Sequence, residues 1–473
     1  MDTADQQSAK HEGRLQNTVL LMVLLNGFTT PLMLSATNVA LPAMADDLQL
    51  SAVALSWIPM AYLVASAMFV LPFGGLADRI GRKRVFLQGT VAVILTSILA
   101  AVSFNATMLI SARFLQGVAS AMLYATQIAI LSSVFPAQKR GQMVGLLVSS
   151  IYVGLAAGPF IGGFVIDTLG WRYGFLLQLP LALVVLLVGV FKVDGEWSAN
   201  SQAPFDTVGA ITFCTSLLLI CVAATRLPLL DGFVMLVTGT ILAVTFVRHA
   251  LKIPEPIWDV RLFFTNRLFT LSCLASLVMY SATYANVVLL SLFLQYLKAL
   301  SATQTGMILM LQPLTMAVLS PLAGRLSDRI EPRLLATSGV AMTTIGLALL
   351  ATLDSTSRIS SVVMSLLISG AGFALFSSPN INSIMGSVEA RQMGSASGAV
   401  ATMRTLGQLI SMLLVSLMLN LFMGSAVISE ENYPVLERTV SVAFGLAAAL
   451  CLVGMAMSLA RGTLHSGKKG ASA

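Results

Sequence analysis

Two arginines, Arg113 and Arg404, lie inside long apolar stretches of the sequence. A guanidinium stays protonated at physiological pH and donates five N–H groups, so it binds carboxylates, phosphates and amide oxygens. All 20 Asp and Glu residues lie in polar segments or at the ends of apolar stretches, so neither arginine has an evident counter-ion. The pattern predicts that Arg404 is hydrated, bonded to amides or carbonyls, or neutralised by a bound molecule, and that Arg113 faces the interior of a helix bundle or a cavity. For Arg113, a side chain that extends to a nearby membrane surface is the alternative.

The composition indicates a membrane protein. The chain has 473 residues, of which 57% are hydrophobic and 10% charged, and its mean hydropathy is +0.88. An average soluble domain carries about 25% charged residues. The net charge of +7 does not indicate nucleic-acid binding, because the basic residues are dispersed in short segments. The four cysteines are scattered and form no CxxC pair, which favours neither a metal site nor a disulfide.

Fourteen stretches reach the roughly 20 apolar residues that a membrane-spanning helix needs. We therefore predict an all-α polytopic membrane protein. The predicted spans are 17–40, 53–76, 85–104, 107–133, 143–166, 174–191, 207–224, 232–248, 269–297, 305–323, 334–353, 359–385, 393–420 and 439–460.

The distribution of Lys and Arg predicts that both termini are cytoplasmic. With that orientation, 20 of the 27 basic residues lie in inner segments and five in outer loops, while Arg113 and Arg404 lie inside spans. Cytoplasmic loops of membrane proteins carry such an excess of basic residues.

A repeated segment indicates an internal duplication. Residues 74–84 read GGLADRIGRKR and residues 323–333 read AGRLSDRIEPR, so Asp78 and Asp328 occupy matching positions after spans two and ten. Two six-helix repeats around a central cavity are a known transporter architecture. We predict six-helix bundles at 1–191 and 269–473, with a two-helix insert and its connectors at 192–268.

Three motifs resemble those of the major facilitator superfamily. The segment around Gly74, Asp78, Arg79 and Arg82 resembles motif A, and Arg113-x-x-Gln116-Gly117 resembles the RxxQG motif. Span five resembles the antiporter motif C, in which small residues allow close helix packing and a proline adds a bend. Its matching residues are Gly145, Gly154, Gly158, Pro159, Gly162 and Gly163.

Further matches resemble the fourteen-span drug:proton antiporter family within this superfamily. They include Asn38-Val-Ala-Leu-Pro42 and Phe205-Asp206-x-x-Gly209. The resemblance implies a proton-coupled secondary transporter in the cytoplasmic membrane that exports hydrophobic drugs or toxic compounds. It implies gating or coupling roles for Asp47, Asp78, Arg79, Arg82, Arg113, Gly154, Gly158, Pro159, Gly162 and Asp328. Two alternatives remain for the charged loops. The basic segment of motif A can serve only to orient the protein in the membrane, and Asp47 can be an ordinary solvated loop residue.

One departure from the family pattern affects the mechanism. The family usually has an aspartate five residues before the asparagine of its NVALP-type motif, and this chain has Met33 there. No histidine can replace it, because His11, His249 and His465 are all predicted in cytoplasmic segments. The titratable groups that remain are Asp78 at the inner side and Asp46, Asp47 and Asp167 at the outer rim.

Polar side chains on the spans are the expected contacts of an amphiphilic small-molecule substrate. Because arginine is present and no acid balances a cation, we expect neutral or anionic substrates to be handled better than dications. The predicted contacts are Asn26, Thr30, Asn38, Gln116, Gln127, Tyr280, Tyr284, Asn286, Gln312, Asn380, Asn382, Arg404 and Gln408.

Three functions are compatible with the sequence: a drug exporter, an exporter of an endogenous metabolite or lipid-like anion, and a non-transporting membrane receptor. The intact motifs A and C argue against the receptor. An enzyme is not expected, since there is no nucleotide-binding loop, metal cluster or nucleophile constellation. We expect no cofactor, a proton gradient as the energy source, membrane lipid and protons as partners, and a monomer.

Overall fold

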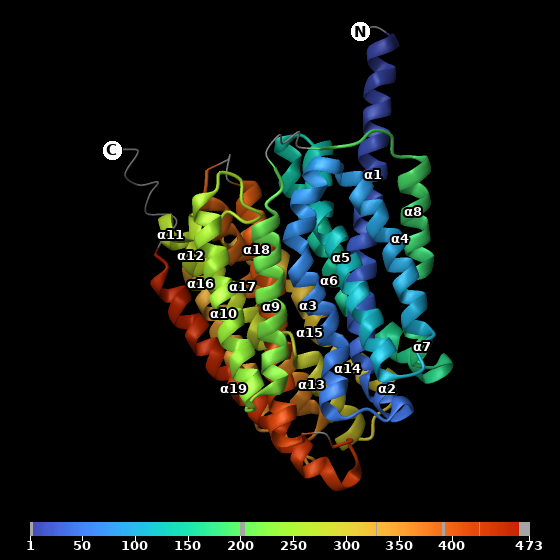
Figure 1. The fold of residues 1–473 in the computed structure, drawn as a ribbon, viewed down its shortest axis with the longest axis vertical. Coiled ribbons are helices and arrows are strands. Elements are labelled where there is room, and N and C mark those ends of the chain that lie inside the picture. The colour runs from blue at the N-terminus through green and yellow to red at the C-terminus, as the bar shows by residue number, and fades with distance from the viewer. Residues whose placement is uncertain (1–2, 199–203, 328, 390–392, 425, 463–473) are drawn as a thin grey trace.

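The computed structural model describes residues 3–198, 204–327, 329–389, 393–424 and 426–462. Within these ranges, fourteen helices are long and apolar enough to cross a membrane, and they run side by side in one bundle (Figure 1). The predicted all-α fold with fourteen spans is confirmed. We call the end of the bundle from which α1 projects the inner end, after its predicted orientation, and the opposite end the outer end.

The N-terminal half consists of six spanning segments and two short helices at the outer end. Several of these helices begin at a polar N-cap residue. The Ser51 hydroxyl accepts from the Ala54 N–H, and the Asn105 side chain accepts from the Met108 N–H. The helices are α1 Thr3–Val39, α2 Leu41–Leu48, α3 Ala52–Ile80, α4 Arg82–Ala101, α5 Ala106–Val134, α6 Ala137–Leu169, α7 Trp171–Gly174 and α8 Leu179–Phe191.

The C-terminal half contains two spans that are broken rather than continuous. The span predicted at 269–297 divides at Tyr284, where the Ala285 N–H donates to the Ser411 hydroxyl instead of continuing the helix. The next span breaks at Met310, because Pro313 has no N–H to donate back to Leu309. The helices are α12 Arg267–Thr283, α13 Asn286–Leu292, the π-helix η1 Phe293–Leu297, α14 Ala302–Leu309, α15 Leu311–Ser327, α16 Pro332–Ala351, α17 Ile359–Gly386, α18 Met393–Phe422, the 3-10 turn η3 Glu430–Asn432 and α19 Tyr433–Ala460.

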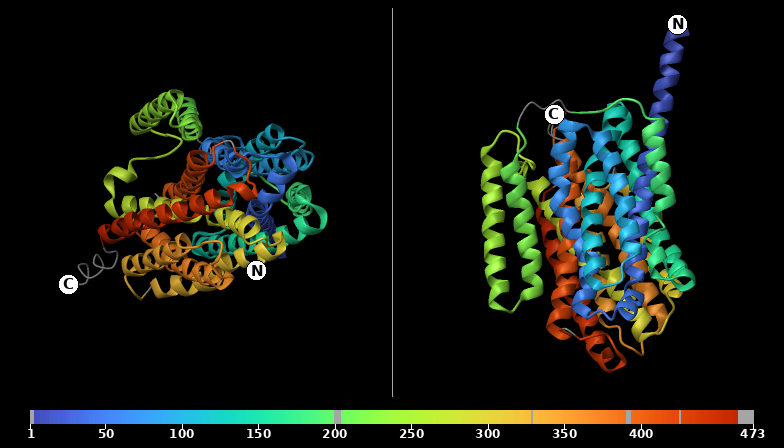
Figure 2. Two further views of the ribbon diagram at one scale, coloured as in Figure 1. Left: turned by 90° about the horizontal axis from the view of Figure 1, so that it is seen from below. Right: turned by 45° about the vertical axis from the view of Figure 1, so that its right-hand side comes forward.

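The insert forms a hairpin of α9 Thr207–Arg226 and α10 Leu230–Lys252, followed by the short helix α11 Leu262–Thr265. The hairpin stands at the edge of the bundle in both views of Figure 2. Helix α9 is bonded to both halves. The Cys214 thiol donates to the Met68 carbonyl of α3, and Asn420 of α18 donates to the carbonyls of Thr225 and Leu227. The insert therefore contacts both halves of the bundle.

Candidate functional site

Arg404 lies near the middle of α18, at the interface between the two halves. On the next turn, a Cβ atom at Gly407 would lie 2.6 Å from the Leu277 carbonyl oxygen and 2.7 Å from Tyr280 Cβ. Only glycine permits this approach of α18 to α12. The approach places the Tyr280 ring beside Arg404, with 6.0 Å between the ring centroid and the guanidinium carbon.

Four tyrosines from the two halves lie within electrostatic range of the Arg404 guanidinium. Tyr124 and Tyr152 come from α5 and α6, and Tyr280 and Tyr284 from the C-terminal half, and all four interact with it electrostatically. Arg404 is half-buried, and no described residue accepts a hydrogen bond from it or pairs with it. A charge at this depth is costly without a partner, so this guanidinium is available to water or to a bound anion.

Arg113 of α5 is fully buried in the N-terminal half and is nearly saturated with partners. Its Nε donates to the Ile58 carbonyl at 3.2 Å, and Nη1 donates to Gln116 Oε1 at 2.5 Å and to Met33 Sδ at 3.6 Å. The Tyr62 ring stacks on it, with 4.6 Å from centroid to guanidinium carbon. Only Nη2 lacks a partner. The sulfur of Met33 thus occupies the place next to Arg113 where the family resemblance implied a carboxylate.

Two tyrosines connect the environments of the two arginines. Tyr124 and Tyr284 each interact electrostatically with both Arg113 and Arg404. The Tyr124 hydroxyl is 3.2 Å from the Tyr62 hydroxyl. The Tyr284 hydroxyl lies close to Asn38, but it makes no hydrogen bond of normal geometry. The result is one polar cluster, which we call the arginine–tyrosine cluster: Asn38, Tyr62, Arg113, Tyr124, Tyr152, Tyr280, Tyr284 and Arg404.

The outer end of the interface is closed by hydrogen bonds between the halves. Asp167, at the end of α6, accepts from the Ala302 and Thr303 N–H groups at the N-terminus of α14, at 3.2 and 2.8 Å, and from the Thr303 hydroxyl at 2.5 Å. A carboxylate stabilises a helix N-terminus. Other bonds across this end join Ser56 to Ser416, Tyr296 to Asp46, Gln295 to Val39 and Ala52 to Ala426.

Asp47, by contrast, does not connect the halves. Its carboxylate accepts from Arg172 at 2.8 Å and from the Trp171 indole at 3.2 Å. Both partners lie on α7, in the same half as Asp47. The predicted coupling role of Asp47 stays a prediction.

Helix α6 carries the glycines of motif C on two packing faces. A Cβ atom at Gly154, Gly158 or Gly162 would come within 2.2 to 2.6 Å of α1, in the same half. A Cβ atom at Gly163 would lie 2.3 Å from the Ala302 carbonyl oxygen of α14, in the other half. Pro159 lies on this second face, because its carbonyl oxygen is 2.0 Å from the Cβ position of Gly306. Motif C therefore fixes α6 to α1 and provides the surface on which α14 rests.

The interface loosens toward the inner end. Residues of α3 are buried almost continuously from Ala52 to Met68, but after Met68 only Ala77 is buried. Cβ positions at Gly74, Gly145 and Gly398 have no neighbouring atom within 4 Å. A further hydrogen bond between the halves joins Tyr152 to Ser377. In the described residues the two halves are therefore held together at the outer end and pack more loosely toward the inner end.

Motif A lies at this loosened inner end and is bonded within its own half and to the connector. Asp78 pairs with Arg82 at 2.7 Å, and Arg82 also donates to the Ser133 hydroxyl. Arg79 donates to the Pro204 carbonyl and lies over the Phe205 ring at 5.4 Å. The N-terminus of α4, which follows Asp78 in the chain, is capped by the connector residue Glu196, which accepts from the Lys83 and Arg84 N–H groups. Asp328, the predicted counterpart of Asp78, lies outside the described residues.

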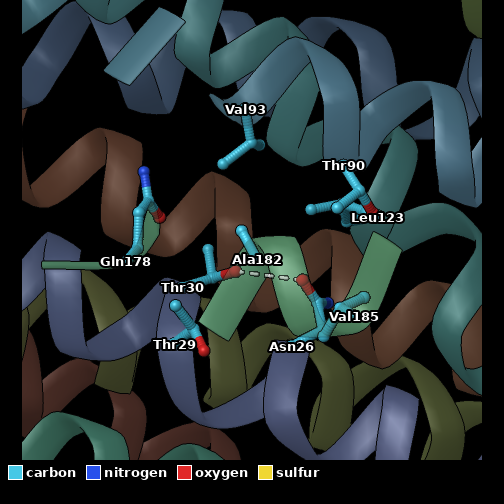
Figure 3. Close-up of a pocket in the computed structure, with 9 residues that line it drawn as sticks. All are labelled: Asn26, Thr29, Thr30, Thr90, Val93, Leu123, Gln178, Ala182 and Val185. Carbon is cyan, nitrogen blue, oxygen red and sulfur yellow. Dashed lines mark hydrogen bonds between the residues drawn. The ribbon is translucent and has the colours of Figure 1, made fainter. Parts of the chain in front are cut away.

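Several predicted substrate contacts lie inside the N-terminal half rather than at the interface. Asn26 donates to Gln127 and accepts from Thr30. Asn26 and Thr30 line a cavity of about 10 Å³ between α1, α4, α5 and α8 (Figure 3), which has room for one water molecule. Gln116 donates to the Ser97 hydroxyl and accepts from Arg113. The structure therefore places these residues inside the N-terminal half and not at a cavity between the halves.

The remaining predicted contacts are dispersed in the C-terminal half. Asn286 lines a cavity of about 20 Å³ with Ser281 and Ser411. Asn380 bonds Ser276 and Arg461, and Asn382 bonds Ser327 near the inner end. Gln312 is buried and Gln408, one turn after Arg404, is half-buried. Of the predicted set, the arginine–tyrosine cluster includes Asn38, Tyr280, Tyr284 and Arg404.

Sequence reasoning missed Tyr62, Tyr124 and Tyr152, although a signal existed. The chain has only 8 tyrosines, and tyrosine in membrane helices normally lies at the interfaces. Tyrosines in the middle of a span therefore indicate a polar interior. Arg461 was also missed: it ends α19 with 2% exposure, and it donates to Asn380 and to the Pro332 carbonyl. Burial lowers its pKa to about 10.

Comparison with known proteins adds the following findings. The sequence matches the family described as Major Facilitator Superfamily over residues 23–412, with a second match over 271–470. It is 32% identical to the uncharacterized transporter YebQ of Escherichia coli (strain K12), covering 81% of this chain and 85% of YebQ. It is 28% identical to the riboflavin transporter RibZ of Clostridioides difficile (strain 630), covering 93% and 96%.

A drug-resistance protein and a solved structure are also similar. The multidrug resistance protein Stp of Mycobacterium tuberculosis (strain CDC 1551 / Oshkosh) is 29% identical, covering 85% of this chain and 75% of Stp. The crystal structure of the peptide transporter POT in complex with sulfate matches with a TM-score of 0.69 at 16% identity, covering 95% of this chain and 96% of POT. The solved structure supports the fold.

Proposed function

The chain belongs to the Major Facilitator Superfamily, and from that premise we propose that it exports amphiphilic drugs or toxic compounds across the cytoplasmic membrane by alternating access. It is a multi-pass membrane transport protein and not an enzyme. The observation that supports export by alternating access is the arginine–tyrosine cluster, because residues of both halves meet there beneath a closed outer end and a loosened inner end.

The proposed direction rests on motif C and on the relatives. Motif C resembles an exporter mark, and in this chain its glycines hold α6 against α1 while its other face carries α14. Such a helix suits a rocking interface, because small residues permit close sliding contacts. The relative Stp is named as a multidrug resistance protein. Substrate would enter the cluster from the inner end and leave after the bonds at the outer end break.

Protons are the driving ion that we propose, with both termini in the cytoplasm and the protein acting as a monomer. The described membrane interior has no carboxylate at mid-depth, so the coupling proton must bind near an end of the bundle. Asp78 with Arg79 and Arg82 is the proposed group at the inner end. At the outer rim, Asp46 and Asp167 accept hydrogen bonds from the other half, whereas Asp47 does not. A carboxylate whose bonds join the halves can link protonation to movement.

A second candidate function is export of an endogenous metabolite or lipid-like anion. The observation that favours it is Met33, which contacts Arg113 where the family resemblance implies an acid. The named activity of RibZ, riboflavin transport, shows that a relative handles a metabolite.

Efflux from proteoliposomes with an imposed pH gradient tests the proposed function. Vesicles with purified protein are loaded with a fluorescent amphiphile, and release is followed with and without the gradient. We expect release to exceed that of protein-free vesicles and to increase when the compartment facing the outer end is acid. Release that does not depend on the gradient would rule out proton coupling. No release of any tested amphiphile would rule out the exporter function.

A further inference from the structure

We propose that Arg404 binds the charged group of a monoanionic aromatic substrate, an aromatic carboxylate or sulfonate, at the interface between the halves. The inference rests on the proposed function, because it names the substrate class of the same transporter. It starts from a property that separates the half-buried Arg404 from the buried Arg113 and Arg461: its N–H groups have no acceptor among the described residues.

The contrast with Arg113 and Arg461 shows that the chain can satisfy a buried guanidinium. Arg113 donates to a carbonyl, an amide oxygen and a thioether. Arg461 donates to Asn380, Ser272 and the Pro332 carbonyl. Arg404 lies over the Tyr280 ring and interacts electrostatically with four tyrosines, and no described residue accepts a hydrogen bond from it. Since such partners are supplied elsewhere in the fold, their lack at Arg404 indicates that a bound molecule supplies them.

The guanidinium carbon of Arg404 lies over the Tyr280 ring at 6.0 Å, and no described residue accepts a hydrogen bond from its N–H groups. The Tyr280 ring lies against Arg404, and Tyr280 is itself held in an edge-to-face contact with Phe373 at 5.3 Å. A cation–π contact occupies a face of the guanidinium and leaves the planar fork of donors for a carboxylate. The Tyr284 hydroxyl, also without a hydrogen-bond partner, is a second donor.

The tyrosine rings define the remainder of the ligand. The Tyr152 hydroxyl is paired with Ser377, and the Tyr124 hydroxyl with Tyr62. These hydroxyls are satisfied within the protein, so the rings contribute mainly aromatic surface. An aromatic body stacks on such surface, and offset or edge-to-face packing adds to affinity. A substrate with one charge and one aromatic body therefore satisfies both parts of the cluster.

The second arginine of the cluster, Arg113, makes the site favour a negatively charged ligand. Arg113 is too enclosed to contact a ligand in this conformer, but Tyr124 and Tyr284 lie within electrostatic range of both guanidinium groups. With two positive charges and no carboxylate among the described residues of the cluster, the potential there is positive. A cation of the same size is repelled, and a neutral analogue leaves Arg404 without a counter-ion.

Three probes of matched size test the proposal: radiolabelled 1-naphthaleneacetate, its methyl ester and the cation 1-naphthylethylamine. Binding is measured by equilibrium dialysis on the purified full-length protein. We expect the anion to bind at least tenfold more tightly than the ester, and the cation to bind more weakly than either. Arg404→Gln should abolish this preference without weakening ester binding, Arg404→Lys should retain part of it, and Tyr284→Phe should weaken anion binding severalfold.

Arg172→Gln is the matched control, because it removes an arginine at the outer rim. It should leave the preference unchanged. The proposal is overturned if the three probes bind alike, if the ester or cation binds best, or if folded Arg404→Gln protein keeps the full preference. Failure of this proposal and failure of the proposed function give different results. Gradient-driven efflux without a charge preference would support the exporter and rule out the anion site. Anion binding without transport would support the anion site and rule out the exporter.

Discussion

Replacing Asp167 by asparagine should open the outer end of the transporter. The ionised carboxylate accepts from two backbone N–H groups and one hydroxyl at the N-terminus of α14. Hydrogen bonds to a charged group contribute about 1.5–3 kcal/mol net when buried, and charge at a helix N-terminus about 0.3–1 kcal/mol. Asp167 is exposed, so solvent screening reduces both. The amide of asparagine retains one oxygen acceptor. We therefore expect the closed outer end to lose about 1.4 kcal/mol of stabilisation, which shifts the equilibrium about tenfold toward the outward-open state.

The assay is the labelling rate of a cysteine at Ser416 by a membrane-impermeant maleimide. The Ser416 hydroxyl is 2.9 Å from that of Ser56 and is enclosed while the outer end is shut. The background protein has its native cysteines replaced, at positions Cys214, Cys221, Cys273 and Cys451. Labelling applied to the outer side should become about tenfold faster in Asp167→Asn than in the parent.

Asp47→Asn is the control, because it removes the same charge from the same rim. Its partners, Trp171 and Arg172, lie in its own half, so labelling should change less than twofold. Equal acceleration by both variants would show that rim charge in general, and not the bond between the halves, holds this end closed. No acceleration by Asp167→Asn would refute the reasoning outright.

Three further predictions concern other contacts. Gly158→Ala should lower the midpoint of thermal unfolding, because its Cβ would lie 2.6 Å from the Leu32 carbonyl oxygen and overpacking costs about 1–3 kcal/mol. Gly145→Ala is the control: no atom lies within 4 Å of its Cβ position, so the midpoint should stay unchanged or rise. Met33→Asp should place a carboxylate near Arg113 Nη1, and we expect increased efflux of a monocationic dye; unchanged efflux would contradict this. Asn420→Ala removes two bonds from α18 to the end of α9, and it should speed hydrogen exchange near Thr225 but not at Gly209.

The number and approximate bounds of the spans could be predicted from the sequence, because hydropathy over about 20 residues reports directly on the bilayer. The break at Tyr284 could not be predicted. It depends on the Ser411 hydroxyl, which is distant in sequence and accepts the Ala285 N–H from a neighbouring helix.

The position of each polar residue around its helix could not be predicted either. In a soluble helix the apolar stripe marks the buried face, but in a membrane helix the lipid-facing side is apolar as well. Asn26 and Asn38 both lie on α1, yet Asn26 faces a cavity inside the N-terminal half and Asn38 faces Tyr284 of the other half. Their spacing in the sequence does not separate these two environments.

Alternating access is tested most directly by measuring distances at both ends of the molecule in the same samples. Pulsed electron paramagnetic resonance with spin labels at Gly145→Cys and Gly398→Cys reports on the inner end, where neither position has a neighbouring atom within 4 Å. Labels at Tyr173→Cys and Ile359→Cys, both exposed positions near the outer end, report on the other. With saturating substrate and the outer side acid, we predict that the inner distance shortens while the outer distance lengthens. Distances that change in the same direction, or only at one end, would contradict it.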